Sequence, residues 1–325
     1  MKGIRGHGCG WHGRPRHLGS LLTLLGAIAL LLSASAVAAV AHGGGWSAPK
    51  PIDHGTGLTS VSCASSKFCV AVDGNGDAVT YAHGKWGSPK KIDSDGLTSV
   101  SCPSSRFCIA VDMNGRAVAY TKGHWGSPDA IDSGGGGLRS VSCGSTTFCA
   151  AVDATYHAIL YKKGHWGKPK AIDSSKNGKD GLNAVSCAGS FCAAVDQHDG
   201  MTYNGHSWSK PHVVDPKGGF LESISCISKK FCMEVDSEGD AHEYLRGTWG
   251  PPRGPYAGHH FASISCVTTK FCIAVGNHVE VRYYGSPLWR KPKTIDKKAP
   301  LSAISCSSTK RCVVVDTKGN VVTYH

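Results

Sequence analysis

Downstream of one long apolar block at residues 21–32, the chain consists of short apolar stretches separated by polar and glycine-rich ones. None of these stretches shows the 3.6-residue period of an amphipathic helix. In the first unit, residues 58–63, 69–73, 78–82 and 86–93 are predicted to form β-strands, because apolar and β-branched residues fill them and turn residues separate them. Each connection is short enough for a hairpin, so neighbouring strands must run antiparallel.

This four-strand unit recurs along the chain. The segment SCASSKFCVAVD begins at Ser62, and its counterparts, at a spacing of about forty residues, begin at Ser101, Ser142, Ser186, Ser225, Ser265 and Ser305. Four short strands that recur with this period are typical of a β-propeller blade. We therefore expect an all-β, seven-bladed β-propeller of four-stranded antiparallel blades that begin near residues 58, 97, 138, 182, 221, 261 and 301. A β-solenoid of the same repeats is the alternative.

The two ends of the chain fit a closed ring. A tryptophan begins the predicted fourth strand of each unit, yet the last unit stops at Tyr324 and His325, after its third strand. Residues 46–53, which begin with Trp46, form a lone fourth strand before the first unit. Pairing this strand with the last unit would remove two exposed strand edges. The N-terminal strand is therefore predicted to complete the last blade of a propeller that spans residues 42–325.

The N-terminal segment has the features of a secretory signal peptide. Residues 1–41 contain a basic start without a carboxylate, then the apolar block, then a small-residue stretch that ends at Ala39, Val40 and Ala41. The block is too short to span a bilayer comfortably, so no transmembrane segment is expected after cleavage. Cleavage would remove four cations from a chain of formal net charge +12 and leave a basic protein near +8. We expect a secreted protein that is extracellular or associated with the cell envelope.

Of the fifteen cysteines in the chain, only Cys9 lies within the predicted signal peptide. The other fourteen fall two to a unit, which matches a protein that is oxidised outside the cell. Zinc sites would need two further ligands beside each pair, and no histidine recurs in register beside all the cysteines. Because a hairpin holds the two cysteines of a unit close together, seven local disulfides are predicted. The pairs are Cys63–Cys69, Cys102–Cys108, Cys143–Cys149, Cys187–Cys192, Cys226–Cys232, Cys266–Cys272 and Cys306–Cys312.

The pattern S-C-x-S-x-x-F-C-x-A-V-D-x-x-G, followed by tyrosine and then Gly-x-Trp, resembles the repeats of secreted β-propeller proteins from actinobacteria and related bacteria. The resemblance covers all of residues 42–325. It implies the propeller fold and secretion, and it supplies no catalytic residues. The Asp-box of sialidase-like propellers, S-x-D-x-G-x-x-W, fits less well, because two residues separate Asp73 from Gly76 and Trp86 follows ten residues later. The WD dipeptide of another propeller family is absent from the sequence.

An aspartate ends the predicted second strand of six units, usually with a glycine three residues later. Such an aspartate can accept backbone N–H bonds in the turn that follows, so we assign it a structural role. The run from Asp73 to Asp77 superficially resembles a calcium loop, but Ala78 stands where the glycine belongs and no bidentate glutamate follows. We predict neither a metal site nor a cofactor.

The tryptophan and tyrosine of each unit allow two interpretations. They can pack between blades, or they can offer one shallow sugar-stacking site per blade. Four strands spaced about 4.8 Å apart would put equivalent outer residues of adjacent blades about 17 Å from each other, too far to share one small ligand. Packing between blades is therefore the preferred interpretation. For the same reason, His124 and His165 are not expected to share a metal ion.

Strand direction predicts an uneven distribution of charge. The first and third turns of every blade emerge on one face of the propeller, here called the basic face, and these turns contain no Asp or Glu. The cations of the basic face are Lys67, Lys85, Arg106, Lys122, Lys162, Lys163, Lys229, Lys230, Arg246, Lys270, Lys310 and Arg311. The opposite face holds most of the repeat carboxylates, including Asp53, Asp93, Asp132, Asp173, Asp215 and Asp296. The field of the basic face would attract polyanions; the alternative is a solvated face that only aids solubility.

The fifth unit carries the strongest candidate for catalysis. All five glutamates of the chain lie in the fifth and sixth units, and Glu234 replaces the alanine of C-x-A-V-D. If the two cysteines of the fifth unit face each other, antiparallel register would set Glu222 against Asp236, on the same side as Glu234. Three carboxylates within about 5–8 Å would suit glycoside hydrolysis. The alternative is a buried glutamate that pairs with a local cation, Arg246 or His242.

Together, these features predict a secreted, non-catalytic binding module for an anionic polymer or glycan at the cell envelope. The basic-face cations, with His124 and His165, are the candidate ligand-binding residues. A carbohydrate-active enzyme of the glycoside hydrolase or sialidase-like kind, with Glu222, Glu234 and Asp236 as its catalytic residues, is the second hypothesis. A protein-binding scaffold is the third. We expect a monomer and no nucleic-acid partner.

Overall fold

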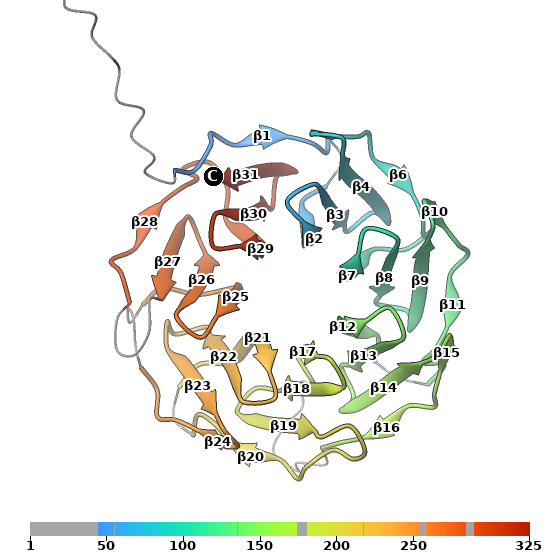
Figure 1. The fold of residues 1–325 in the computed structure, drawn as a ribbon, viewed down its shortest axis with the longest axis vertical. Coiled ribbons are helices and arrows are strands. Elements are labelled where there is room, and N and C mark those ends of the chain that lie inside the picture. Colours follow the sequence, from blue (N-terminus) through green and yellow to red (C-terminus); the bar gives the residue numbers. More distant parts are fainter. Residues whose placement is uncertain are drawn as a thin grey trace, which may run out of the picture. The chain divides into compact units, whose positions relative to one another are not determined.

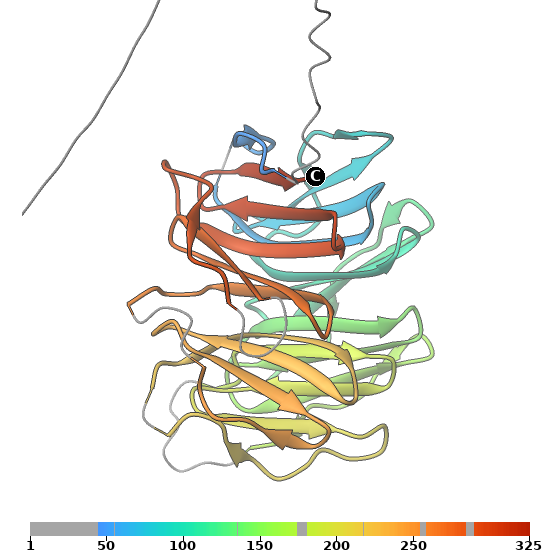
Figure 2. The same ribbon diagram turned by 60° about the vertical axis from the view of Figure 1, so that its left-hand side comes forward.

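The computed structural model describes residues 45–54, 56–134, 136–173, 181–216, 218–253, 258–283 and 289–325. These residues form seven separate β-sheets, arranged as blades around a central opening (Figure 1). A second view shows neighbouring blades packed side by side (Figure 2). The seven-bladed propeller is thus confirmed, and the solenoid alternative is wrong. Over the described part of the chain, no helix has the length and apolar character needed to cross a membrane.

Each blade runs outward from the central opening. The innermost strands are β2 (Leu58–Ser65), β7 (Leu97–Ser104), β12 (Leu138–Ser145), β17 (Ala184–Ala188), β21 (Leu221–Ser228), β25 (Ser263–Thr268) and β29 (Leu301–Ser308). The second strands are β3 (Phe68–Asp73), β8 (Phe107–Asp112), β13 (Phe148–Asp153), β18 (Phe191–Val195), β22 (Phe231–Asp236), β26 (Phe271–Gly276) and β30 (Arg311–Asp316). The third strands are β4 (Asp77–Ala82), β9 (Arg116–Thr121), β14 (His157–Lys162), β19 (Asp199–Tyr203), β23 (Ala241–Leu245), β27 (Val279–Tyr283) and β31 (Asn320–Tyr324). The outer strands are β1 (Lys50–Pro51), β5 (Lys85–Trp86), β6 (Lys90–Lys91), β10 (His124–Trp125), β11 (Asp129–Ala130), β15 (His165–Trp166), β16 (Lys170–Ala171), β20 (His212–Val213), β24 (Thr248–Trp249) and β28 (Lys293–Thr294).

The outer edge of a blade differs from the single fourth strand that the sequence predicted. In the first blade, β5 pairs with β4 at Trp86 and Tyr81, and β6 pairs with β4 again at Lys91 and Asp77. Between these pairings Gly87 still donates its N–H to the Thr80 carbonyl oxygen at 2.9 Å, and the chain then leaves the sheet. Pro89 lies in this segment, and a proline has no N–H to donate to a neighbouring strand.

The N-terminal strand closes the ring, as predicted. Strand β1 pairs antiparallel with β31, with Lys50 opposite Val321. Closer to the N-terminus, Trp46 forms a β-bridge with Tyr324, and the centroids of their rings lie 5.4 Å apart. The last blade therefore combines the two ends of the chain, and β31 has no exposed edge along this contact.

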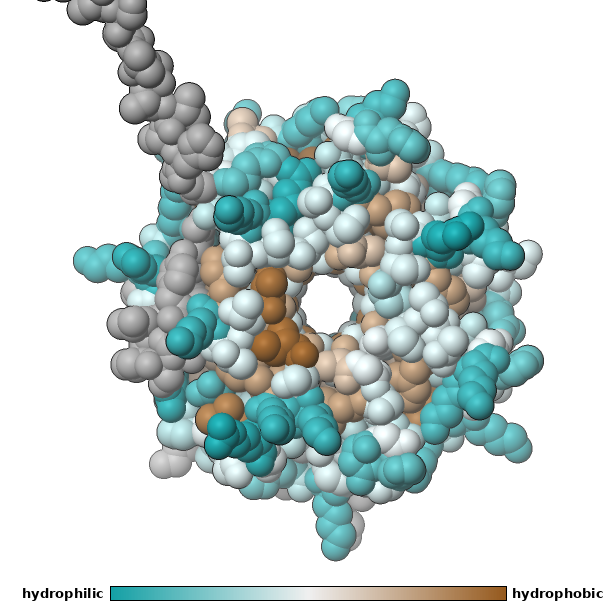
Figure 3. Space-filling model, in the orientation of Figure 1, coloured by the Kyte–Doolittle hydropathy of each residue, from teal (hydrophilic) through white to brown (hydrophobic). Residues whose placement is uncertain are grey.

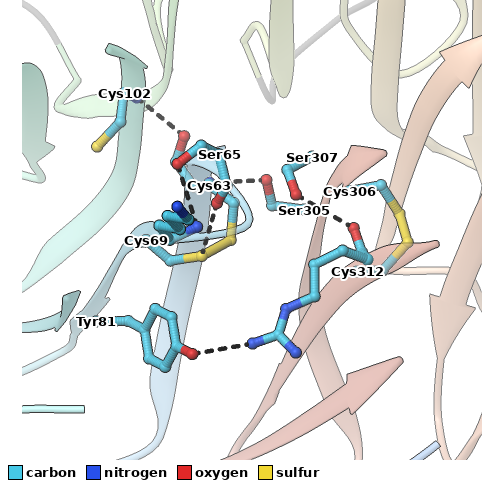
Figure 4. The surroundings of a disulfide bond; sticks show 12 residues. Cys63, Ser65, Cys69, Tyr81, Cys102, Ser305, Cys306, Ser307 and Cys312 are labelled. Atoms are coloured by element: carbon cyan, nitrogen blue, oxygen red, sulfur yellow. Dashed lines mark hydrogen bonds between the residues drawn. A yellow bond between two sulfur atoms is a disulfide. The ribbon is translucent and has the colours of Figure 1, made fainter. Parts of the chain in front are cut away.

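Serine side chains join the innermost strands of neighbouring blades. Ser62 Oγ accepts the backbone N–H of Cys102 at 2.9 Å, and the equivalent bond recurs at all seven seams, including that of Ser305 to Cys63 (Figure 4). We call these residues the serine belt: Ser62, Ser101, Ser142, Ser186, Ser225, Ser265 and Ser305. A second bond of this kind, which Ser60 makes in the first blade, recurs at five seams. The serines therefore satisfy N–H groups on the free edge of each innermost strand, which has no further strand to pair with.

Every blade contains one disulfide, and all seven are the local pairs predicted from the hairpins. In the first blade, Cys63 lies directly opposite Cys69 in the register of β2 and β3. By the chain-entropy model, closing so short a loop stabilises the fold by about 2 kcal/mol. Each disulfide thus fixes the base of a hairpin turn on the basic face.

The core consists of seven apolar layers, one between each pair of neighbouring blades. In the layer between blades one and two, Val70 of one blade packs with Val118 of the next. Toward the basic face, Tyr120 packs on Phe68 of the preceding blade and on Trp125 of its own, with ring centroids 5.9 and 5.3 Å apart. This arrangement supports the interpretation of the repeat aromatic residues as packing between blades.

The second turn of each blade anchors the loop that arrives from the blade's outer edge. Asp73 Oδ1 accepts the N–H of Asp77 at 2.7 Å, which confirms the structural role of the strand-two aspartate. Gly76 has a φ of +92°, and its carbonyl oxygen accepts the N–H of Asp93 at 3.1 Å. A Cβ atom on Gly76 would lie only 2.4 Å from the Asp93 carbonyl oxygen, so glycine is required for this close approach.

Candidate functional site

The basic face has the composition that strand direction predicted. Of its twelve cations, all except Arg311 are exposed, and so are His124 and His165. None of the ion pairs found among the described residues involves any of these side chains. The face therefore carries positive charge that no neighbouring carboxylate neutralises.

Two of the twelve cations contribute to packing between blades. The guanidinium of Arg311 is half-buried, donates to the hydroxyl of Tyr81 at 3.3 Å, and contacts the ring of His325. Lys162 Nζ donates to the hydroxyl of Tyr203 in the next blade at 2.9 Å. Arg311 in particular is part of the seam between blades seven and one, which the sequence did not indicate.

Two hollows open between blades at the first-turn end. One, of about 790 Å³, lies between blades one and two and is lined by Lys67, Phe68, His83 and Tyr120 among others. The other, of about 710 Å³, lies between blades four and five and is lined by Ala188, Gly189, Ser190, Phe191, Thr202, Asn204, Ile227, Ser228, Lys229 and Tyr244. Both volumes are within the usual range for small-ligand sites. Neither lining includes a carboxylate.

Apolar side chains gather beside the central opening, above the positions of β21 and β25 (Figure 3). Ile227 and Val267, near the ends of these strands, are both partly exposed. The equivalent residues in the other blades are Ala64, Pro103, Gly144, Ala188 and Ser307. Blades five and six thus carry larger aliphatic side chains than any other blade at this position.

The carboxylates of the fifth blade do not form the open group that the sequence suggested. Glu234 lies opposite Ile224, as expected, but a β-bulge between Leu221 and Ser223 places Leu221 opposite Asp236. The expected pairing of Glu222 with Asp236 is therefore wrong. Glu234 and Asp236 are both fully buried, whereas Glu222 is only partly buried and lies 3.7 Å from His260.

Glu234 pairs instead with His242, one of the two local cations considered above. The carboxylate Oε2 and the imidazole Nδ1 lie 2.9 Å apart, and both side chains have an exposed fraction of 0%. Burial raises the pKa of Glu234 to about 8, while the hydrogen bond from His242 opposes this rise. Glu234 Oε1 and His242 Nε2 are buried without a hydrogen-bond partner. The pair is an enclosed polar contact in an otherwise apolar layer.

The interblade aspartates are buried, although the sequence placed them on a face. All six have exposed fractions between 2% and 6%. They are Asp53, Asp93, Asp132, Asp173, Asp215 and Asp296. At three seams burial, together with a nearby aspartate across the seam, raises the pKa of one carboxyl group: that of Asp132 beside Asp153, of Asp196 beside Asp173, and of Asp316 beside Asp296. The opposite face is therefore less acidic at its surface than its sequence suggests.

Among the residues that the structure describes, two groups of carboxylates have oxygens close enough to hold a metal ion. The first group consists of Asp93, Asp95 and Asp112. The guanidinium of Arg116 pairs with all three of these carboxylates and so neutralises part of their charge. The second, at the seam between blades three and four, comprises Asp173, Asp196 and Asp199, whose oxygens lie within 4.8 Å of one another.

Burial and the neighbouring Asp173 raise the pKa of Asp196 to about 7. An unfolded chain releases this proton near the ordinary pKa of 3.8, so between about pH 4 and pH 7 the folded state holds a proton that the unfolded state has lost. The stabilisation is therefore full at acidic pH and lost as pH rises through 7. Asp196→Asn keeps the oxygen that accepts two backbone N–H groups and removes the charge. We expect it to raise the melting temperature at pH 8 by about 2–6 °C and to flatten its pH dependence.

Asp112→Asn is the matched control for this change. Arg116 Nε donates to Asp112 Oδ2 at 2.7 Å, so loss of this charge should lower the melting temperature at neutral pH. Thermal melts of both variants from pH 4 to pH 8 would show whether the two substitutions change the melting temperature in opposite directions. Equal destabilisation by the two substitutions at pH 8 would show that the charge of Asp196 is not unfavourable in the folded protein.

Comparisons with known proteins establish the fold and nothing finer. No protein-family model and no curated protein matches the chain. Among solved structures, YCF48 bound to D1 peptide is 15% identical over 86% of this chain and 96% of its own, with a TM-score of 0.68. YCF48 from Cyanidioschyzon merolae is 15% identical, with coverage of 86% and 98% and a TM-score of 0.66. The WD40 β-propeller domain of Doa1 is 10% identical, with coverage of 87% and 97% and a TM-score of 0.71.

Proposed function

We propose that the protein is a secreted, non-catalytic binding module that holds an anionic polymer or glycan of the cell envelope on its basic face. A seven-bladed propeller fits a binding or scaffold module. The observation that supports an anionic ligand is the set of exposed, unneutralised cations at turns that contain no carboxylate. Charge spread over the hairpins of a ring suits a long repeating polymer better than a compact ligand.

Secretion is part of the same proposal. Seven disulfides are compatible with an oxidising, extracellular location. The predicted signal peptide lies outside the described residues. The resemblance to secreted actinobacterial repeats also favours this location.

A protein-binding scaffold is the second candidate. The apolar patch of Ile227 and Val267 beside the central opening favours it, because exposed apolar patches commonly mark protein contacts. One similar propeller is bound to a peptide. In contrast, the carboxylates of the fifth blade give no support to the enzyme hypothesis, since Glu234 and Asp236 are buried.

Charge reversal tests the proposed function. Lys67, Arg106, Lys230 and Lys270 occupy the same hairpin position in four blades and are all exposed. Changing all four to glutamate should weaken binding to teichoic acid or an acidic polysaccharide by about tenfold or more at low salt, because it inverts the local field. Binding by the parent protein should itself fall between about 0.01 and 0.15 M salt, as the Debye length shortens from roughly 30 to 8 Å.

The matched control changes net charge equally but elsewhere. Lys50, Lys90, Lys170 and Lys293 are exposed on outer strands, and their change to glutamate should leave the affinity within about twofold. Equal losses in the two quadruple variants would show that net charge alone matters. Tighter binding of a neutral glycan by the parent protein at both salt concentrations would contradict an anionic ligand.

A further inference from the structure

The seam between blades four and five departs from the repeat in three ways. The first hairpin of blade four is one residue shorter, with cysteines separated by 5 positions where the other blades have 6. Ala184 replaces the serine that five other blades use for the second interblade bond, a change that blade seven shares at Ala303. Where the first blade has Ala71 opposite Val79, the fifth blade has Glu234 opposite His242. Such local departures are expected where a repeat has acquired a specific role.

The shortened hairpin is held against blade three. A Cβ atom on Gly144 would lie only 2.0 Å from the carbonyl oxygen of Gly189, so the two backbones approach as closely as glycine allows. Gly189 has a positive φ of 62°, which lets this tight turn form. The hollow of about 710 Å³ lies on the other side of the same hairpin, facing blade five.

The lining of this hollow combines three kinds of group. Lys229 supplies positive charge, and Lys230 and Arg246, both exposed, lie in adjacent turns of the same blade. Ser190, Thr202 and Ser228 supply hydroxyl groups. Ala188 and Ile227 supply an aliphatic surface.

The aromatic residues of the hollow are not available for stacking on a sugar. Phe191 and Tyr244 stack on each other with centroids 6.0 Å apart. Their exposed fractions are only 9% and 7%. Stacking on a sugar requires an open ring face, so an aliphatic group against Ile227 is the better apolar match.

We propose that this hollow binds a short acidic peptide segment, with a carboxylate at Lys229 and a neighbouring aliphatic side chain against Ile227. The lining contains a cation and no carboxylate, which favours an anionic ligand by charge complementarity. The hydroxyl groups and the hairpin backbone can bond the peptide's amide groups. This inference is independent of the proposed function, because it requires neither a polymer nor the rest of the basic face.

Three labelled hexapeptides serve as probes: alternating Leu and Glu, alternating Leu and Gln, and alternating Gly and Glu. The mature chain, residues 42–325, is titrated with each by fluorescence anisotropy. Ile227→Ser introduces the residue that blade seven has at the equivalent position, Ser307. Lys229→Ser introduces the residue that blade two has at the equivalent position, Ser105. We expect the Leu–Glu peptide to bind tightest, and each substitution to weaken it about fivefold or more. Ile227→Ser should leave the Gly–Glu peptide within about twofold, since that peptide has no aliphatic side chain.

Two control variants keep the result interpretable. Ile227→Val copies Val267 of blade six and should retain most of the affinity. Lys67→Gln changes the hollow between blades one and two, which has a cation but no aliphatic side chain larger than alanine, and should leave Leu–Glu binding unchanged. Melting temperatures are measured for every variant, so that a loss of binding is accepted only from a folded protein.

The proposal is overturned if the Leu–Gln peptide binds as well as the Leu–Glu peptide, or if Lys67→Gln weakens binding as much as Lys229→Ser. It is also overturned if no hexapeptide binds. Titration of the same variants with teichoic acid separates the two proposals. Ile227→Ser should leave that binding unchanged even if the peptide site is real, so a loss of peptide binding alone concerns the hollow and not the polymer.

Discussion

Removing residues 42–53 should lower the melting temperature by about 10 °C or more, which corresponds to roughly 6 kcal/mol for a domain of this size. The truncation removes β1 from the last blade and uncovers the edge of β31. It also removes Ile52, which is 6% exposed in the layer between blades seven and one, and the contact of Trp46 with Tyr324. Burial of an isoleucine alone stabilises a fold by about 1.5–3 kcal/mol. Thermal unfolding followed by circular dichroism provides the measurement.

Peptide rescue is the control for this truncation. A synthetic peptide of residues 42–53 should raise the melting temperature of the truncated protein in a concentration-dependent way, because it can replace β1. A scrambled peptide should not. If the truncated protein melts at the same temperature as the protein of residues 42–325, the closure of the ring by β1 contributes little to stability.

Breaking the buried pair in blade five should also have a large effect. His242→Met would leave the Glu234 carboxyl buried without its hydrogen-bond partner, which costs about 1–3 kcal/mol. Glu234→Ala would leave the imidazole in an apolar layer, at a cost of about 1–3 kcal/mol. The double variant should be close to the parent in stability, because it restores the combination that blade four uses, Ala194 opposite Met201.

The four proteins form a double-mutant cycle. Denaturant unfolding with the disulfides intact gives each free energy of unfolding, and an interaction energy of more than about 2 kcal/mol is expected between Glu234 and His242. If the two single costs simply add in the double variant, the contact between the two side chains is not what the single substitutions disrupt.

The architecture followed from the sequence because its signals are local. The period of the repeats, the turn residues and the paired cysteines all lie within one blade, and so do the strands that they predict. Ring closure could be predicted as well, because the last unit lacks a fourth strand and residues 46–53 form a fourth strand without a unit. The outer strand was predicted too long because the effect of a single residue, Pro89, was not considered.

The candidate sites depended on contacts between blades, which local patterns do not reveal. Ser62 reaches a backbone group forty positions away, at Cys102, and its sequence neighbours give no sign of that partner. In the sequence Arg311 is one of twelve predicted surface cations, and its hydrogen bond to Tyr81 of the next blade becomes visible only in the structure. The register of Glu222 failed for a different reason, because a β-bulge shifts pairing by one residue without a sequence signal that distinguishes it.

The serine belt gives the ring a direction. Within this belt each blade accepts hydrogen bonds from the next blade and donates to the one before, so every seam is a head-to-tail contact. In the intact ring the final acceptor, Ser305, meets the first donor, Cys63, and no unmatched surface is left over. A chain cut after any whole blade would instead have a free acceptor end and a free donor end that complement each other. The acceptor end of one copy can bind the donor end of another, and this leaves both outer ends free to bind further copies. Fragments of this protein should therefore assemble into open chains unless they contain all seven blades.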